Sequence, residues 1–424
     1  MSSQYWKSFG RSGGYVLFLV ACLLCAEIFI RCIGHHDVDG NFYIRFRKLK
    51  PYSLPLKSVR EKVTRYLATT HPSGLYDPVL GWTPTPDFCE PNPGYCYDGN
   101  GIRVLNAGQA FLEKPQRDIL RIAIFGDSFV HGAQVPFAET WGYLLEQAFK
   151  KTGLQVEVLN FGAPGYGMDQ ALLRWRQTGR GFSPDIVIMG FQPENVSRNV
   201  NLLRPLYYDV TGIPFAKPRF VLAGKKLKLL NVPTPKPEEM AGLIEHVTDW
   251  GLLPYEYWYR AEDYRQHLWL KSKLIGLFLD RIENGIPFFF GLSYRRTVFA
   301  LGREPAKMTL AILQAFREEV VSSGARFFVV HLPRQQDLDA LVRGKELPYK
   351  ELLKAVEAFS EVVRPEDAMA RKAREMTVKG VCPRHYSKAG NEIVADTIFR
   401  FLQSEIGVSI EEVGDRGKSQ DDIF

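Results

Sequence analysis

Residues 119–132 read ILRIAIFGDSFVHG, and this stretch sets the expectations for the rest of the chain. Its first seven residues are apolar apart from Arg121 and rich in branched side chains, which predicts a buried parallel strand. The turn that follows presents Ser128 at the carboxyl end of that strand, where open α/β sheets place their ligands. There the hydroxyl lies beside the N-terminus of the next helix, where backbone N–H groups stabilise a developing oxyanion. The plainer interpretation is an ordinary strand-to-helix turn in which Asp127 or Ser128 caps the helix.

Two further predicted strands end in polar or glycine-rich loops, and a late loop carries a histidine. Residues 156–159 lead into a turn around Gly165, and residues 185–190 lead into a loop with Asn195. His385 stands just before the last helical pattern. Because a serine hydroxyl is a weak nucleophile, it needs a general base, most often a histidine. Strands that alternate with helices predict a three-layer α/β/α fold with a parallel sheet.

The order of these blocks resembles the SGNH (GDSL-like) hydrolase superfamily, in its membrane-anchored bacterial form, over roughly residues 76–402. The resemblance implies a flavodoxin-like α/β/α core. It also implies that Ser128 is the nucleophile and that His385 is the general base. The oxyanion hole would then consist of the Ser128 N–H, Gly165 and Asn195.

The third block departs from the superfamily pattern, which usually reads Gly-x-Asn-Asp. Here four residues separate Gly190 from Asn195. Either a longer loop delivers Asn195 to the site, or Gln192 supplies the amide donor, and we favour Asn195.

The last block departs further, because the superfamily usually has Asp-x-x-His and this chain has Cys382 three residues before His385. A thiol cannot hold an imidazolium as a carboxylate does, so the usual third member of the triad is missing. The candidate substitutes are Asp367 or Glu366 from the preceding loop, a backbone carbonyl, or no group at all.

Residues 13–33 form an apolar stretch that approaches the ~20 residues needed to cross a bilayer. Lys7 and Arg11 precede it, as in a signal anchor. The strongly basic stretch 45–65 follows it and favours a cytoplasmic body by the positive-inside rule. Anchored members of the resembled group are commonly exported, however. We therefore expect a single-pass membrane protein with an extracytoplasmic (periplasmic) catalytic domain.

The composition and charge of the chain limit the classes of molecule that it is expected to bind. The net charge of +7 is concentrated in residues 45–65, without any nucleic-acid-binding module, so we expect no nucleic-acid partner. The basic stretch is interpreted either as a segment near anionic lipid head groups or as a solvated linker helix. The expected substrate is an acylated small molecule or glycan.

Cys89 and Cys96 flank a turn-rich segment that can bring their Cα atoms within disulfide range. Such a bridge is typical of proteins outside the cytosol. No pairs of cysteines or clusters of histidines have zinc spacing, so we predict no metal and no cofactor.

These landmarks divide the chain into four parts. Residues 1–34 are a cytoplasmic tail and membrane anchor, and residues 35–118 are a basic connector and irregular lead-in. Residues 119–405 are the hydrolase domain, with a large, mainly helical, lid-like insertion at 200–306 that also contains a small hairpin. Residues 406–424 are expected to be a disordered tail.

The predicted function is serine-dependent hydrolysis of a carbohydrate or lipid O-acyl ester, through an acyl-enzyme at Ser128 with His385 as the base. The first alternative is an O-acetyltransferase that acts on an extracellular polysaccharide. The second is a catalytically impaired glycan-binding or assembly protein, an alternative kept open by Cys382.

Overall fold

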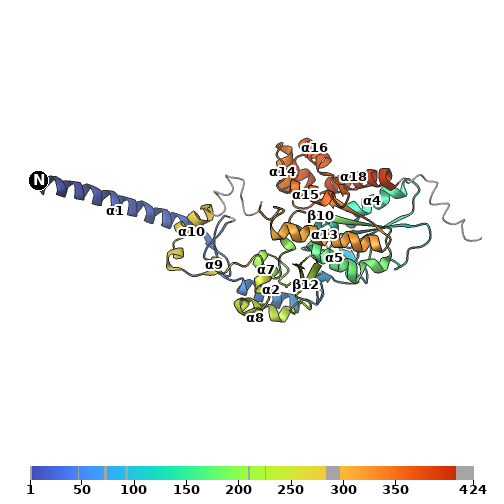
Figure 1. The fold of residues 1–424 in the computed structure, drawn as a ribbon, viewed down its shortest axis with the longest axis horizontal. Coiled ribbons are helices and arrows are strands. Elements are labelled where there is room, and N and C mark those ends of the chain that lie inside the picture. The colour runs from blue at the N-terminus through green and yellow to red at the C-terminus, as the bar shows by residue number, and fades with distance from the viewer. Residues whose placement is uncertain are drawn as a thin grey trace, which may run out of the picture.

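A computed structural model describes residues 2–45, 47–70, 74–90, 94–208, 211–224, 226–282 and 297–406. A long helix, α1 (Ser2–Ile33), projects from a body that holds the rest of these residues (Figure 1). The expected disordered tail lies outside the described residues, apart from residue 406.

A sheet of seven strands lies at the centre of the body, within the described residues. Its strand order is β14-β13-β10-β8-β9-β7-β6. The first five strands are parallel, and along the chain they follow the flavodoxin-like order 2-1-3-4-5. Their bounds are β8 Leu120–Phe125, β9 Val156–Asn160, β10 Ile186–Phe191, β13 Arg326–His331 and β14 Val362–Val363.

The sheet is mixed rather than purely parallel. Two short strands from the lead-in, β6 (Cys96–Tyr97) and β7 (Arg103–Val104), extend it beyond β9 in antiparallel directions. The lead-in therefore belongs to the central sheet, because its extended segments complete the hydrogen bonds of an edge that would otherwise be open.

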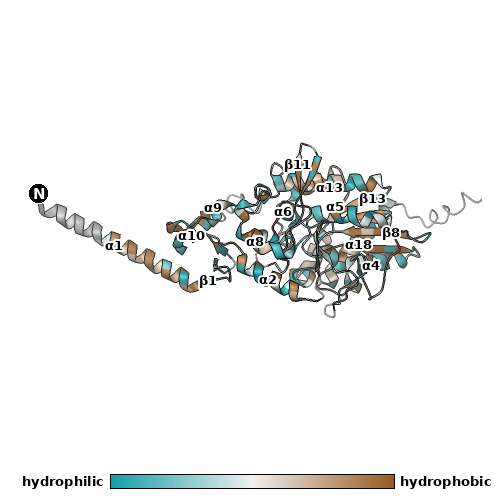
Figure 2. Ribbon diagram, turned by 90° about the horizontal axis from the view of Figure 1, so that it is seen from below, coloured by the Kyte–Doolittle hydropathy of each residue, from teal (hydrophilic) through white to brown (hydrophobic). Residues whose placement is uncertain are grey.

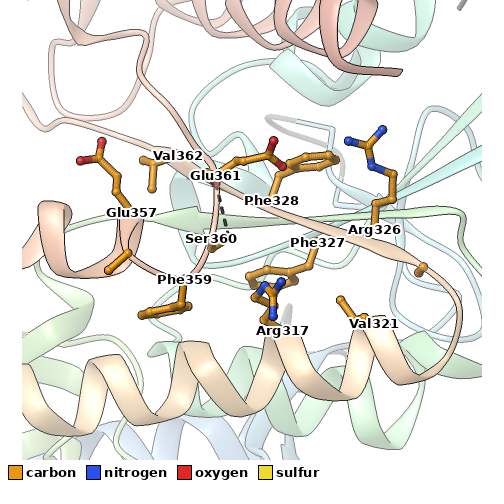
Figure 3. Close-up of a pocket in the computed structure, with 12 residues that line it drawn as sticks. Arg317, Val321, Arg326, Phe327, Phe328, Glu357, Phe359, Ser360, Glu361 and Val362 are labelled. Atoms are coloured by element: carbon orange, nitrogen blue, oxygen red, sulfur yellow. Dashed lines mark hydrogen bonds between the residues drawn. The ribbon is translucent and has the colours of Figure 1, made fainter. Parts of the chain in front are cut away.

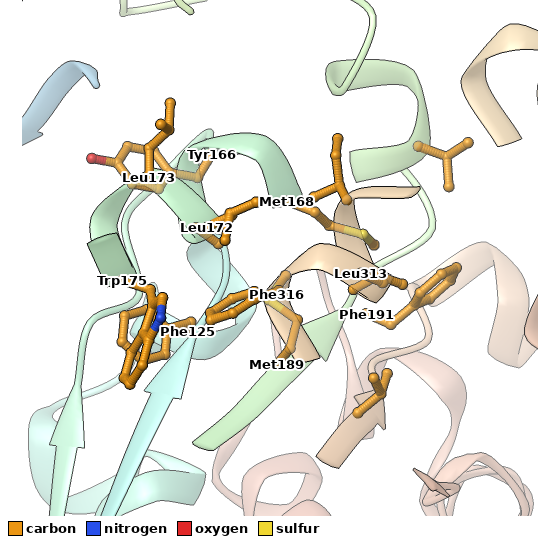
Figure 4. Packing of buried hydrophobic residues seen from close by; sticks show 14 of the residues in the cluster. Phe125, Tyr166, Met168, Leu172, Leu173, Trp175, Met189, Phe191, Leu313 and Phe316 are labelled. Carbon is orange, nitrogen blue, oxygen red and sulfur yellow. The ribbon is translucent and has the colours of Figure 1, made fainter. Parts of the chain in front are cut away.

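Helices cover both faces of the sheet, since the side chains of each buried strand alternate between two apolar layers. Ala123 and Phe125 of β8 face one layer, whereas Ile122 and Ile124 face the other. In the first layer Phe125 packs against Trp175 and Phe316 (Figure 4). The first layer contains α5 (Met168–Gln177), α13 (Glu304–Ser322) and α15 (Lys350–Glu357), and the second contains α4 (Trp141–Lys150), α14 (Gln335–Val342), α16 (Glu366–Met376) and α18 (Lys388–Ile406).

The insertion contains a hairpin, β11 (Arg219–Ala223) with β12 (Lys226–Leu230). Its described α-helices are short, and they are α7 Arg204–Tyr207, α8 Met240–Glu245, α9 Ala261–Tyr264 and α10 Lys273–Asp280. Part of the insertion packs against α2 (Leu56–Ala68) through a separate apolar cluster. The start of the insertion thereby lies against the connector rather than standing alone.

The basic connector is folded. Three short strands form a small antiparallel sheet at its start, and α2 follows them; the strands are β1 His35–His36, β2 Phe42–Ile44 and β3 Arg47–Leu49. Several of its basic side chains pair with acids of the insertion, namely Arg47 with Asp280 at 2.7 Å, Lys50 with Asp263 at 2.7 Å and Arg60 with Glu245 at 2.8 Å. These three basic side chains are thus directed at the protein itself.

Within α1, residues Gly14–Ile33 are long and apolar enough to cross a membrane. Most of their side chains are exposed, and the helix is apolar over this stretch (Figure 2). A soluble protein would gain nothing by exposing such a helix, because burial of apolar surface drives folding.

Candidate active site

The turn after β8 places Ser128 at the carboxyl edge of the sheet. Gly126 has φ +156°, and a Cβ atom there would lie 2.5 Å from Val130, so the turn requires glycine. The side chain of Asp127 accepts a hydrogen bond from the Phe129 N–H at 2.9 Å and so caps α3 (Ser128–His131). Asp127 is therefore the helix cap, and Ser128 is the first helical residue.

His385 meets Ser128 across 257 residues of sequence. Its Nε2 atom lies 2.9 Å from Ser128 Oγ, and its Nδ1 atom lies 3.1 Å from Gln134 Oε1. A carboxamide oxygen only accepts hydrogen bonds, so this network assigns the ring hydrogen to Nδ1. The Nε2 lone pair then faces the serine hydroxyl, which is the tautomer that a general base requires.

Ring packing and several hydrogen bonds hold the loop that carries His385 in place. The imidazole packs against the Phe129 ring with centroids 5.0 Å apart. The Tyr386 hydroxyl donates to the Pro333 carbonyl at 2.9 Å. Asn391 Nδ2 donates to the Tyr386 carbonyl at 3.2 Å, and its Oδ1 accepts from the Trp141 N–H at 3.0 Å. The histidine is therefore held by packing and by hydrogen bonds that reach α4.

The charge state of His385 suits a base. Burial lowers its pKa to about 4, and the nearby cations Arg384 and Arg198 act in the same direction. The ring is consequently neutral at pH 7 and able to accept a proton.

The two carboxylates expected to orient His385 lie elsewhere. Glu366 is buried beside a different histidine, His331, with Oε2 2.9 Å from its Nδ1, and it also pairs with Arg364 at 3.0 Å. Asp367 is exposed at the start of α16 and lines a surface hollow. The side chain in contact with His385 Nδ1 is instead that of Gln134, which the sequence prediction missed because an amide in a loop carries no motif.

Among the described residues, the thiol at the usual aspartate position makes no hydrogen bond to His385. Cys382 is fully buried within an apolar cluster, and burial raises the pKa of its thiol to about 12. Its Sγ atom lies 3.9 Å from the Arg384 carbonyl oxygen. The side chain therefore stays neutral and serves packing.

Arg198 joins the three motif blocks, and sequence reasoning missed it as well. Its Nη1 atom donates to Asp127 Oδ2 at 2.9 Å, to the Tyr166 carbonyl at 3.0 Å and to Asn195 Oδ1 at 3.0 Å. Burial alone would lower the pKa of Arg198, but the carboxylates of Glu194 and Asp127 outweigh it and raise that pKa. A charged guanidinium thus ties the serine turn, the glycine turn and the asparagine loop together.

The bond from Arg198 fixes how the Asn195 amide points. Because Oδ1 accepts from the guanidinium, Nδ2 faces away from it, and this atom is buried without a partner among the described residues. Leaving a buried donor unpaired costs roughly 1–3 kcal/mol, so such a group is typical of a site that binds an acceptor. Gln192 is buried and bonds locally, with Oε1 accepting from the Glu194 N–H.

Gly165 adopts φ +82°, a left-handed conformation that favours glycine. Arg204 from the insertion donates through Nη1 to its carbonyl at 3.1 Å, which holds the turn from outside. Within the part of the chain that the structure describes, neither the Gly165 N–H nor the Ser128 N–H has a hydrogen-bond partner. These two groups and Asn195 Nδ2 are therefore free donors on three successive strand ends.

A disulfide joins Cys89 to Cys96, with Cα atoms 4.0 Å apart. It secures the start of β6, where the Tyr97 hydroxyl lies 2.8 Å from Nε2 of the buried His131 in α3. The bridge therefore supports the edge of the sheet next to the serine turn. Among the described residues, no group of three or more His, Cys, Asp or Glu side chains could hold a metal ion.

A surface hollow of about 670 Å³ lies away from these residues (Figure 3). Its lining includes Arg326 and Phe327, the first residues of β13, together with Arg317 of α13. It therefore opens at the amino-terminal end of the parallel strands, opposite to Ser128. Parallel α/β sheets bind ligands at the other end, so this hollow is not the candidate active site.

No protein-family profile matches the sequence, and a search of curated proteins gives no match. Solved structures do match. A member of the lipolytic G-D-S-L family from Veillonella parvula is 12% identical with a TM-score of 0.33, covering 67% of this chain and 98% of its own. A lipase/acylhydrolase from Enterococcus faecalis is 14% identical with a TM-score of 0.34, covering 68% and 96%.

The acetylxylan esterase Axe2 from Geobacillus stearothermophilus is 12% identical with a TM-score of 0.36, covering 66% of this chain and 92% of its own. These three structures are thus a lipolytic protein of the G-D-S-L family, a lipase/acylhydrolase and an acetylxylan esterase. Because these TM-scores lie below 0.5, the activity of this chain has to be argued from Ser128, His385 and their neighbours.

Proposed function

We propose that this chain is a serine esterase or acyltransferase of the SGNH type that acts on an O-acyl ester. The observation that carries the proposal is the 2.9 Å contact of His385 Nε2 with Ser128 Oγ, combined with the bond of Nδ1 to Gln134. Together they give a neutral base in the correct tautomer beside a serine at a strand end.

In the proposed reaction, Ser128 Oγ attacks the ester carbonyl carbon while His385 Nε2 takes the hydroxyl proton. The resulting oxyanion accepts hydrogen bonds from the N–H groups of Ser128 and Gly165 and from Asn195 Nδ2. The ester C–O bond then breaks, and His385 returns the proton to the leaving alcohol. Attack on the acyl-enzyme by water completes hydrolysis, and attack by a sugar hydroxyl completes transfer.

We place the reaction outside the cytoplasm, on a chain anchored by residues 14–33. The disulfide between Cys89 and Cys96 supports this side of the membrane, because disulfides persist in oxidising compartments and are rare in the cytosol. The apolar length of α1 supports the anchor. Fusing a reporter that works only in the periplasm to the C-terminus tests the topology, and an inactive fusion would return the body to the cytoplasm.

A fluorophosphonate probe tests the chemistry on the full chain in detergent. The wild type should become labelled and Ser128→Ala should not. Ser322→Ala removes an exposed hydroxyl at the end of α13 and should label like the wild type. If no labelling occurs in correctly folded wild type, the glycan-binding alternative replaces the enzyme. Product analysis with a soluble acetyl ester, with and without a polysaccharide acceptor, separates hydrolysis from transfer.

A further inference from the structure

The end of α1 is bonded to α10 of the insertion, although about 240 residues of sequence separate them. The Glu27 carboxylate accepts hydrogen bonds from Ser272 Oγ at 2.8 Å and from the N–H groups of Lys273 and Leu274 at 2.9 and 2.8 Å. Arg31 Nη2 donates to the Lys271 carbonyl at 2.8 Å. Glu27 therefore satisfies the free N–H groups that open α10, and the two helices are joined firmly.

Packing reinforces this junction on one face of α10. Leu274 and Leu277 contact an apolar cluster that contains Ile30 of α1 with Phe42 and Leu49 of the small sheet. Figures 1 and 2 both show α10 beside the end of α1, away from the central sheet. The junction thus combines buried apolar contacts with hydrogen bonds. Together they oppose rotation of α10 relative to α1.

The junction also fixes the height of α10 relative to the apolar span. Glu27 lies inside the span Gly14–Ile33, six residues before its end. At a rise of 1.5 Å per residue this is about 9 Å from the end of a stretch that is itself about 30 Å long. A hydrocarbon core is also about 30 Å thick, so when the span fills the core the start of α10 lies about 9 Å inside the boundary between acyl chains and head groups, within the ~5–10 Å to which interfacial helices bury their apolar face.

The other face of α10 and the turn before it expose apolar side chains. Leu268 is 78% exposed, Trp269 51% and Phe278 63%. Ile275, Phe278 and Ile282 recur at helical spacing, so they line one side of the helix. Two exposed basic residues, Lys271 and Arg281, stand within this segment, and Arg31 donates to the Lys271 carbonyl. A tryptophan beside apolar residues and exposed basic residues are typical of a segment that lies in a membrane interface.

We propose that residues 268–282 lie in the plane of an anionic bilayer surface and form a second membrane contact beside α1. The occupant of the exposed apolar face is the boundary layer of the membrane, because α10 is bonded to the end of the proposed span and the exposed Lys271 and Arg281 match anionic head groups. The proposal rests on the proposed anchor. Its consequence is that the body has one fixed orientation above the membrane.

Photo-crosslinking of the full chain in vesicles of phosphatidylcholine and phosphatidylglycerol tests this contact. A diazirine amino acid is placed at Leu268 or Phe278, at Phe18 within α1, or at Val321, which is 48% exposed on α13. Fluorophosphonate labelling of each variant reports folding. Lipid adducts are expected at positions 18, 268 and 278, with none above background at 321.

The remaining outcomes separate the two proposals. Adducts at position 18 with none at 268 and 278 would overturn the interfacial segment and leave the anchor in place. Crosslinks between two protein chains at 268 and 278, instead of lipid adducts, would assign this face to a second copy and also overturn it. Absence of adducts at all three positions would overturn the anchor and the interfacial segment together.

Discussion

Two histidines stand near the carboxyl edge of the same sheet, and their surroundings differ in an instructive way. His331, the last residue of β13, has a carboxylate 2.9 Å from Nδ1 and the Tyr349 hydroxyl 3.1 Å from Nε2. His385 has the Gln134 amide on Nδ1 and the Ser128 hydroxyl on Nε2. Among the described residues, the ring in contact with a carboxylate has no serine partner, and the ring in contact with Ser128 has no carboxylate within hydrogen-bond distance.

The two partners differ in charge: Glu366 places a carboxylate beside His331, whereas Gln134 places a neutral amide beside His385. Burial alone would raise the pKa of Glu366, but contacts with His331 and Arg364 lower it to about 2, as in a structural ion pair. An amide fixes the tautomer of His385 without adding negative charge, so burial is free to lower the pKa of that ring to about 4. Orientation and charge stabilisation, which one aspartate supplies in a triad, are therefore separated here.

The largest expected effect comes from replacing each of the two histidines in turn. His385→Ala should lower kcat for an activated ester by roughly 10⁴–10⁶-fold, because the serine loses its base. His331→Gln should leave kcat per folded molecule unchanged and lower the melting temperature. Ester hydrolysis and thermal unfolding are measured on both variants, and a similar loss of kcat in the two would refute the assignment.

Gln134 offers a sharper test of orientation against charge. Gln134→Ala should lower kcat about 10- to 100-fold, since it removes one hydrogen bond worth roughly 1–3 kcal/mol. Gln134→Glu adds the missing charge and should raise kcat, because a carboxylate stabilises the imidazolium.

The control for Gln134→Glu is Gln403→Glu, an exposed position on α18, which should change nothing. If Gln134→Ala retains full turnover, the amide has no part in orienting the ring.

The pH dependence of kcat/KM follows from the same contrast. With a pKa of about 4, His385 is deprotonated above that pH, so the rate should stay level from pH 7 to about 5 and fall below about 4. In Gln134→Glu the acidic limb should move upward, toward or above the ordinary histidine value of about 6.5. A wild-type limb already near 6.5 would contradict the lowered pKa.

The smallest expected effect concerns stability alone. Glu366→Gln should leave kcat unchanged and lower the free energy of unfolding by roughly 1–3 kcal/mol at pH 7, as expected for a lost buried charge contact. The folded pKa of Glu366 lies below its ordinary value of 4.5, so its stabilisation is present above that pH and is lost as pH falls toward 2.

Urea unfolding at pH 7 and pH 3 should therefore show a smaller difference between Glu366→Gln and the wild type at pH 3. Asp367→Asn, at the exposed neighbouring position, is the matched control and should stay within about 0.5 kcal/mol of the wild type. Equal destabilisation by both variants would contradict the specific pairing of Glu366 with His331.

The central strands could be predicted from sequence because each is a short run of buried apolar residues that ends in a loop. The positions of Ser128 and His385 at one edge then follow from parallel topology. The antiparallel edge strands β6 and β7 could not be predicted, because two-residue strands have no periodic pattern.

The side chains that contact the two histidines could not be predicted from the sequence either. Glu366 was a candidate to orient His385, yet the fold carries it to His331. Gln134 reaches His385 only through the conformation of the loop after α3, with φ +73° at Gln134 itself. The spacing of Arg198 three residues after Asn195 on one short helix, α6 (Asn195–Arg198), was a usable signal, since such residues are neighbours on a helix surface.

The separation of Ser128 from His385 by 257 residues also has a consequence in time. Synthesis at about 5–20 residues per second leaves the serine without its base for roughly 10–50 s. During that interval the emerging chain holds an ordinary alcohol. The acyl chemistry that we propose can therefore begin only after residue 385 has been made and its loop has packed against the serine turn.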